Sequence, residues 1–249
     1  MLGHFERLLQ GEDIAGIWAL HCERMASFGF DRLIYGFTRF LTPQIHGNLD
    51  DTLILSNHDP DYLRVFLGEK LFFEAPMVRW AADCVGAQSW RLVAERAQRG
   101  ELSAGEQKVL ALNHRFDVRA GYSIGFPDTS SRAKGAIGLC ARPGLTQDDV
   151  DAIWAAHGRE LWVLNSVLHL KISGMPFPTS RRSLTARQRE VLEWVGDGKT
   201  AADIAQIMGV STATVEKHLR LAREALEVET TAQAVLKATL QKQLFVTAL

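Results

Sequence analysis

Apolar residues recur at two different periods in the first part of the chain, up to about residue 172. Spacings of three and four residues predict helices over 14–28, 61–73, 104–116 and 146–171. Runs rich in branched and aromatic residues predict strands over 31–41, 121–126 and 135–141, with a turn at 127–131. The longest helix has Thr146 as its N-cap and aspartates in its first turn. A unit that combines a sheet with packed helices is typical of an α+β domain.

From Leu184 onward the pattern predicts only short helices. Their expected N-caps are Thr185, Thr200, Ser211 and Thr230, and glutamines three residues after the first and last of these complete capping boxes. The third helix carries one apolar stripe, formed by Val215, Leu219, Ala222 and Leu226. The second and third helices are separated by a turn at Gly209-Val210. This arrangement predicts a helix-turn-helix.

Between these two parts, Gly174, Pro176 and Pro178 interrupt helix and a polar segment follows. We therefore expect a first domain at 1–172, a linker at 173–183 and a second domain at 184–249. Residues 179–249 hold 10 Lys and Arg against 8 Asp and Glu, a charge of +2, and residues 1–178 carry −3. This difference has the sign expected for a DNA-reading module, but it is small.

Composition excludes several classes of protein. With 47% hydrophobic and 23% charged residues, the chain is not expected to be disordered, and a net charge of −1 excludes a polybasic coat. The three cysteines are widely spaced, which favours neither a disulfide framework nor a zinc site, and the histidines lack metal-ligand spacing. There is no apolar run of 18 residues and no signal-peptide pattern. We expect a cytoplasmic protein without membrane contact, metal or cofactor.

The face of the third helix opposite the apolar stripe is polar, as expected of a helix that enters the major groove. The candidate DNA-binding residues on it and at the neighbouring helix starts are Lys199, Thr200, Ser211, Thr212, Thr214, Glu216, Lys217, Arg220 and Arg223. Periodicity alone fits an ordinary four-helix packing module with a solvated charged face equally well.

The identities of the residues favour a DNA-reading helix-turn-helix over a simple packing module. The segment 183–244 closely resembles the LuxR-type DNA-binding domain, through Leu184–Leu192, Gly198-Lys199-Thr200, Ile204-Ala205 and Val210-Ser211-x-x-Thr214-Val215-x-x-His218-Leu219. The resemblance implies a transcriptional regulator. The family usually has a basic or amide residue where Glu216 stands, and Gly or Asn where Glu227 stands. Because a carboxylate can accept a hydrogen bond from cytosine N4, the first departure leaves the operator sequence open.

The first domain is similar to the autoinducer-binding domain of quorum-sensing regulators. The similarity is carried by Ser56-Asn57-His58-x-x-Asp61-Tyr62-x-x-x-Phe66, Ala75-Pro76, Trp90 and Phe116-x-x-Arg119-x-Gly121. It implies an α-β-α sandwich enclosing an acyl-homoserine lactone, joined by a linker to a small all-α helix-turn-helix domain, and a homodimer formed partly through the helix at 146–171. The implied ligand-binding residues are His58, Tyr62, Phe66, Ala75, Trp90, Gly121 and Ser123.

Three positions depart from the family's pattern. Tyr62 stands where the family has the Trp that donates to the lactone carbonyl, Phe66 where it has a Tyr, and Ala75 where it has the Asp that accepts the ligand amide N–H. An unpaired buried N–H costs about 1–3 kcal/mol, roughly 5- to 150-fold in affinity. His58 is a substitute acceptor from the other wall.

These departures leave three ligand hypotheses open: an unusual acyl-homoserine-lactone receptor, a receptor for a ligand with fewer polar groups, and a regulator that folds without ligand. The alternative function is an anti-activator that pairs with a related regulator, and RNA polymerase is a further candidate partner. For Tyr62, Phe66, Trp80 and Trp90 taken singly, aromatic core is the competing interpretation.

A motif typical of hydrolases also occurs. Gly121-Tyr122-Ser123-Ile124-Gly125 matches G-x-S-x-G, in which the serine lies on a turn from a strand into a helix. Here a Phe-Pro turn and a second predicted strand follow, so the chain is not expected to be an enzyme.

Overall fold

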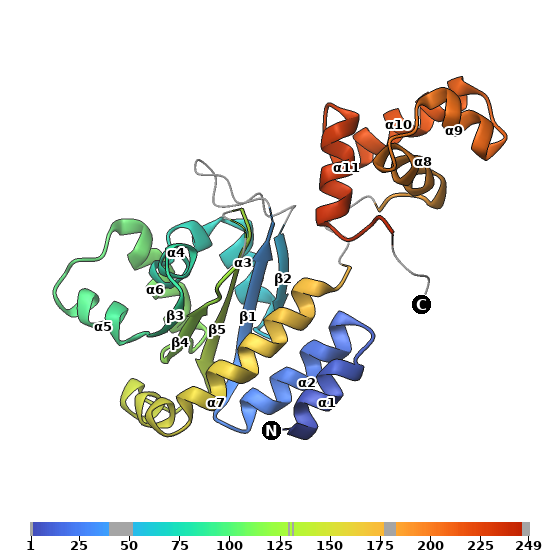
Figure 1. Cartoon of the computed structure of the whole chain (residues 1–249). Helices are drawn as coiled ribbons and strands as arrows, with labels where there is room; N and C mark the ends of the chain where they lie inside the picture. Colours follow the sequence, from blue (N-terminus) through green and yellow to red (C-terminus); the bar gives the residue numbers. More distant parts are fainter. Residues whose placement is uncertain (1, 40–51, 129, 131, 177–182, 246–249) are drawn as a thin grey trace. The chain divides into compact units, whose positions relative to one another are not determined.

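The computed structural model describes residues 2–39, 52–128, 130, 132–176 and 183–245. The chain divides into two compact units, Met1–Gly174 and Met175–Leu249 (Figure 1). The domain boundaries 1–172, 173–183 and 184–249 stay predictions. Among the described residues, no helix combines the length and the apolarity that a membrane span requires.

The first unit is built on an antiparallel five-stranded sheet with the strand order β2-β1-β5-β4-β3. Its strands are β1 (Phe30–Thr38), β2 (Thr52–Ser56), β3 (Gly86–Ser89), β4 (Gly121–Gly125) and β5 (Lys134–Ala141). The first strand therefore lies between the second and the last, and Tyr35 of β1 pairs with Ile137 of β5. This pairing joins segments about a hundred residues apart in the sequence.

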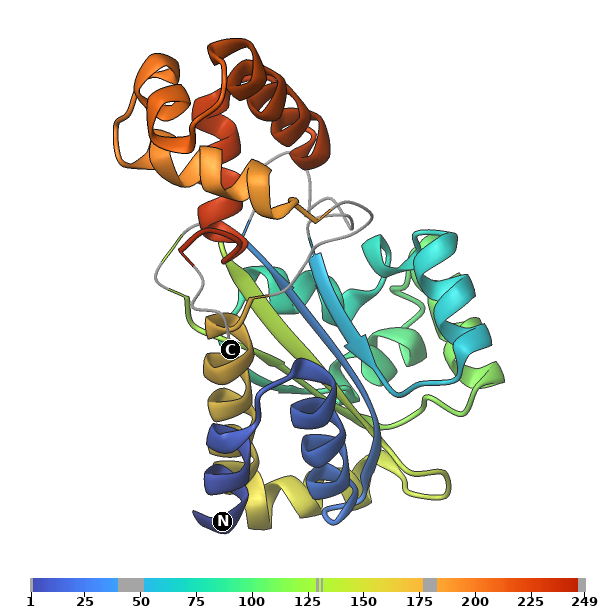
Figure 2. The same ribbon diagram turned by 90° about the vertical axis from the view of Figure 1, so that its right-hand side faces the viewer.

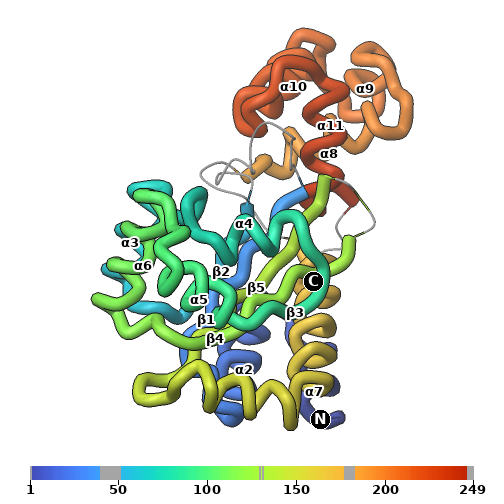
Figure 3. Tube along the Cα trace, turned by 90° about the vertical axis from the view of Figure 1, so that its left-hand side faces the viewer, coloured from blue at the N-terminus to red at the C-terminus, as the bar shows by residue number. Residues whose placement is uncertain are grey.

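Helices cover both faces of this sheet. One face carries α1 (Leu2–Gln10), α2 (Ile14–Ala26) and the long α7 (Gln147–Gly174), as Figure 2 shows. The other carries α3 (Pro60–Gly68), a 3-10 turn at Leu71–Phe73, α4 (Pro76–Asp83), α5 (Arg91–Gln98) and α6 (Ala104–Arg115) (Figure 3). The predicted α-β-α sandwich, an α+β fold, is confirmed.

The two faces of β1 are filled differently. Leu33, Tyr35 and Phe37 point toward α2 and α7 and are almost completely buried, and Tyr35 Oη lies 2.9 Å from Nδ1 of His169 on α7. A Cβ on Gly135 of β5 would lie 2.3 Å from that imidazole, so only glycine fits there. This side of the sheet is a filled core, whereas the side facing α3–α6 is hollow.

The long predicted elements are confirmed, with shifted ends. The predicted helix over 61–73 is wrong as one element, because α3 ends at Gly68 and Lys70 takes a left-handed conformation (φ 56°) before the 3-10 turn. Thr146 does cap α7, since its Oγ1 accepts from the Asp149 N–H at 3.2 Å. The last residues of the predicted strand over 31–41, and positions 129 and 131 of the predicted turn, lie outside the described residues. The sequence analysis missed α1, α4, α5, β2 and β3.

The second unit contains the four predicted helices, α8 (Ala186–Gly196), α9 (Ala201–Met208), α10 (Thr212–Leu226) and α11 (Thr231–Leu240). Each begins at its expected cap, with side-chain oxygens of Thr185, Thr200, Ser211 and Thr230 accepting backbone N–H groups. The predicted stripe on α10 is buried against the other helices. Helix α9 ends at Gly209 with φ 64°, the left-handed turn that leads into α10.

Candidate functional site

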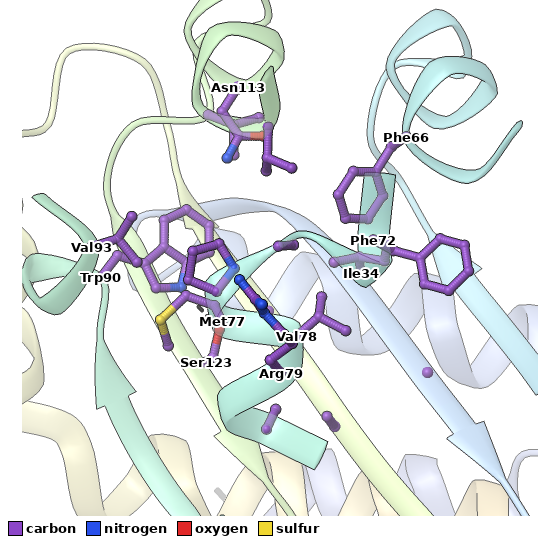
Figure 4. A pocket seen from close by; sticks show the side chains of 18 of the residues that line it. Ile34, Phe66, Phe72, Met77, Val78, Arg79, Trp90, Val93, Asn113 and Ser123 are labelled. Atoms are coloured by element: carbon purple, nitrogen blue, oxygen red, sulfur yellow. Dashed lines mark hydrogen bonds between the residues drawn. The ribbon is translucent and has the colours of Figure 1, made fainter. Parts of the chain in front are cut away.

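A cavity of about 480 Å³ lies between the sheet and α3–α6 (Figure 4). Its floor is made of small residues, Gly36 on β1 and Ala136 and Gly138 on β5. A Cβ on Gly36 would meet no atom within 4 Å, so this face of β1 leaves space that a larger side chain would fill. Because most of its walls are apolar, the cavity suits a small ligand with a substantial hydrocarbon part.

One wall is an aromatic ladder that starts just before α3 and follows it. The rings of His58 and Tyr62 stack with centroids 5.0 Å apart, and those of Tyr62 and Phe66 with centroids 5.4 Å apart. Residues four apart meet on one helix face, which explains why this spacing builds a continuous surface. The Tyr62 hydroxyl donates to Asn113 Oδ1 of α6 at 3.0 Å, and burial raises the pKa of Tyr62 well above its ordinary value.

Trp90 and Ser123 form a second polar feature of the cavity. The indole N–H of Trp90 donates to Ser123 Oγ at 2.9 Å (Figure 4). Gly121 is not among the lining residues; a Cβ there would lie 2.9 Å from the Trp90 ring, so it leaves room for the indole. Ser123 lies in the middle of β4 rather than on a turn into a helix, which does not fit a nucleophile elbow.

The wall at α4 offers no free carboxylate. Ala75 is buried, lines the cavity and precedes α4 without a side-chain cap. The neighbouring Glu74 packs against α6, where a Cβ on Gly105 would lie 2.3 Å from Glu74 Oε2. Among the described lining residues, Glu106 is the one acidic side chain.

Glu106 is already saturated by the protein. Its two oxygens accept hydrogen bonds from Arg79 at 2.7 Å, from Arg96 at 2.9 and 3.1 Å, and from the Ser103 N–H at 2.8 Å. Although burial opposes its ionisation, the bonds from Arg96 and Ser103 hold the pKa of Glu106 below its ordinary value. This cluster ties α4, α5 and α6 together beside the cavity. Sequence reasoning missed it, although Ser103-x-x-Glu106 is a visible capping box.

His58 is the most buried imidazole of the cavity, with 7% of its surface exposed. Its backbone N–H donates to Ser56 Oγ at 3.1 Å. Burial, aided by the charge of Arg32, lowers the pKa of His58 to about 4, so the ring is neutral at physiological pH.

In the second unit, the predicted DNA-binding residues fall into two groups. Lys199, Thr212, Glu216 and Lys217 are exposed; the first stands just before α9, and the other three lie in the first two turns of α10. The others also make contacts within the unit. Thr200 and Ser211 cap helices, and Thr214 Oγ1 lies 2.9 Å from Ser211 Oγ. Arg220 pairs with Glu224 at 2.5 Å, and Arg223 donates to Thr231 at 2.9 Å. Arg220 nevertheless keeps 55% of its side chain exposed.

Two family profiles match the chain. The profile described as an autoinducer binding domain matches residues 13–172, and that described as bacterial regulatory proteins of the luxR family matches residues 182–238.

Individual relatives are regulators. The transcriptional activator protein SolR of Ralstonia nicotianae is 38% identical over 129 residues, which cover 47% of this chain and 52% of SolR, so that match spans about half of the relative's length. The HTH-type quorum sensing-dependent transcriptional regulator RpaR of Rhodopseudomonas palustris is 25% identical over 207 residues, 82% of this chain and 81% of RpaR.

Two solved structures share the fold. SdiA in complex with octanoyl-rac-glycerol has a TM-score of 0.54 at 14% identity and covers 95% of this chain and 92% of its own. The N-acylhomoserine lactone-dependent factor CepR2 of Burkholderia cenocepacia has a TM-score of 0.53 at 17% identity and covers 68% of this chain and 92% of its own.

Proposed function

Because the chain belongs to the LuxR-type family of quorum-sensing transcriptional regulators, which carry an autoinducer-binding domain and are not enzymes, we propose that it couples a small acyl ligand in its cavity to operator binding through α10. The observation that carries the ligand half of this proposal is the glycine-floored cavity under α3–α6. The sheet residues Gly36, Ala136 and Gly138 have no side chains large enough to fill the space beneath the helices, so this space is open to a ligand.

The ligand that best fits is a medium-length acyl chain with a compact polar head. The apolar walls favour hydrocarbon, and hydrogen-bonding groups are few: His58, Asn113 and Ser123 are the principal neutral ones. SdiA, solved in complex with octanoyl-rac-glycerol, and CepR2, described as N-acylhomoserine lactone-dependent, share this fold, which supports a ligand of that class. Of the three ligand hypotheses, the cavity favours a receptor over a regulator that needs no ligand.

Thermal unfolding of the purified chain with a panel of acyl-homoserine lactones and acylglycerols tests whether the cavity binds an acyl ligand. A ligand at 100 times its dissociation constant adds about 2.7 kcal/mol, which raises the unfolding midpoint by roughly 5–10 °C. The matched control is Gly36→Val, which introduces a strand-favouring side chain into the cavity. We expect this variant to fold and to lose the shift. A cavity that responds to no member of the panel would contradict the proposed ligand class.

The DNA half of the proposal is a homodimer that reads a roughly two-fold operator, with the second helix of the helix-turn-helix in the major groove. The exposure of Lys199 and Lys217 supports contacts with phosphates, and that of Glu216 supports a hydrogen bond accepted from cytosine. The exposed Glu216 also supports the alternative of an anti-activator that pairs with a related regulator. Copurification with such a regulator, and no DNA retained by the pure chain, would favour that alternative.

A further inference from the structure

We propose that His58 is the acceptor for an N–H of the bound ligand, so that the cavity selects an acyl amide over the corresponding ester. This inference rests on the proposed function and names the chemistry that the cavity recognises.

The first support is that the ring nitrogens of His58 have no hydrogen-bond partner within the described part of the protein. His58 is 93% buried and lines the cavity, yet among the described residues neither ring nitrogen makes a hydrogen bond. Neither nitrogen is among the unpaired side-chain atoms that the protein encloses completely, unlike both ring nitrogens of His4, so the His58 nitrogens face the cavity. A ligand in the cavity is the natural partner for this imidazole.

The second support is that other side-chain oxygens of the cavity already take part in interactions within the protein, whereas the His58 nitrogens make no hydrogen bond among the described residues. The Glu106 oxygens take four hydrogen bonds, Ser123 Oγ accepts from Trp90, and Asn113 Oδ1 accepts from Tyr62. The side chains of Thr38 and Thr52 have interactions of their own. The side chain of Ala75 is a methyl group, which cannot accept a hydrogen bond. His114 is exposed, so water competes for its ring.

The third support is that the stack fixes the His58 ring and keeps it neutral. Its face lies on Tyr62 at 25° between planes, which leaves the ring edge, where the nitrogens are, free to meet a ligand. A neutral imidazole has one accepting and one donating nitrogen, whereas an imidazolium only donates. The surrounding burial favours the neutral form.

The geometry also provides for the carbonyl of an amide. Because Asn113 accepts from Tyr62 through its oxygen, its amide nitrogen is the donor left over, and Asn113 lines the same cavity (Figure 4). The Ser123 hydroxyl, which accepts from Trp90, likewise keeps its own proton to donate. An N-acyl head would then find one acceptor and two donors, whereas an ester would leave the His58 acceptor unpaired.

The test compares two ligands that differ in one atom. N-octanoyl-homoserine lactone and its ester isostere, with oxygen in place of the amide N–H, are titrated calorimetrically into the full chain. We expect the amide to bind about 5- to 150-fold more tightly, the range for one buried hydrogen bond. In His58→Phe, which keeps the stack on Tyr62, this preference should fall to about one, and in His58→Gln, which keeps an acceptor, most of it should remain.

The matched control is His114→Phe, a histidine at the exposed rim of the same cavity, which should leave the preference unchanged. Ring-nitrogen chemical shifts of His58 should move with the amide and not with the ester. Equal binding of both ligands to the unaltered chain, or a preference that survives in His58→Phe, would overturn the role of His58 while the proposed function stands. If neither ligand binds while an acylglycerol of the panel does, the role of His58 in amide recognition fails and the proposed function stands.

Discussion

Single residues decide what each unit can contact. In the cavity, Gly36 leaves space for a ligand. Ala75 has no hydrogen-bond acceptor in its side chain, whereas the His58 ring has one. In the second unit, Arg220 combines high exposure with an ion pair to Glu224 one turn further along α10. An exposed pair of this kind contributes little stability, so Arg220 can exchange its partner for DNA at low cost.

Replacing Arg220 by Ala should therefore weaken operator binding much more than it weakens the fold. We expect a loss of about 1–3 kcal/mol per half-site, or roughly 5- to 150-fold. The measurement is gel retardation of a DNA fragment that the unaltered chain selects from random sequence. Glu224→Gln, which frees Arg220 without removing it, should bind at least as well. Retardation by Arg220→Ala equal to that of the unaltered chain would show that this face does not read DNA.

At the scale of elements, the helices of the second unit begin at local caps, but they do not all end at a glycine. Four side chains cap α8–α11, and Gly209 ends α9 in the left-handed region that glycine adopts freely. Helix α10 ends instead at Glu227, with φ 55°. A residue with a Cβ is strained there by about 1–2 kcal/mol.

Glu227→Gly should accordingly stabilise the second unit by about 1 kcal/mol, because it relieves that strain at some cost in chain entropy. Urea unfolding followed by the fluorescence of Trp194, in a background where the other tryptophans are replaced by phenylalanine, measures this. Glu229→Gly, two residues later and outside the left-handed turn, is the control and should not stabilise. A lower midpoint for Glu227→Gly would mean that the carboxylate, not the backbone, matters at this position.

At the scale of the whole molecule, buried histidines link stability to pH. Burial is the main cause that lowers the pKa values of four of them to about 4, namely His4, His21, His58 and His169. Because the fold favours the neutral ring, their contribution is complete above the unfolded pKa of about 6.5 and is lost as the pH falls toward 4.

The free energy of unfolding should therefore fall between pH 6.5 and 4 by up to about 1.4 kcal/mol per pH unit for each histidine. Chemical unfolding at pH 7.5 and pH 5.5 measures the difference. His157→Gln, at an exposed position, should leave it unchanged, while His58→Phe should remove one of the four contributions. The carboxylates with lowered pKa values, such as Glu106, lose their contribution only at lower pH. Equal stability at both pH values would contradict this linkage.

The sequence was sufficient wherever structure is set by neighbours within about four residues. Each cap of the second unit and the stripe on α10 could be predicted, because a cap and a stripe are local relations. The aromatic ladder His58–Tyr62–Phe66 has the same origin. By contrast, β3 has the sequence Gly-Ala-Gln-Ser, without a branched residue, and is a strand because it pairs with β4. Helix α5 has only 8 residues, which is too short for a helical period to be recognised.

By itself, then, the sequence determined the family, the α+β and all-α units, the helix-turn-helix and the candidate residues on its face. The tertiary structure decided which of the ligand-side candidates meet. It placed Gly36 of β1 opposite Ala136 of β5 in the cavity floor, and it surrounded the Glu106 carboxylate with arginines from two other helices. It also left the ring nitrogens of His58 without a hydrogen-bond partner among the described residues. Hydrogen-bond saturation and empty volume depend on groups distant in sequence, and no local pattern records them.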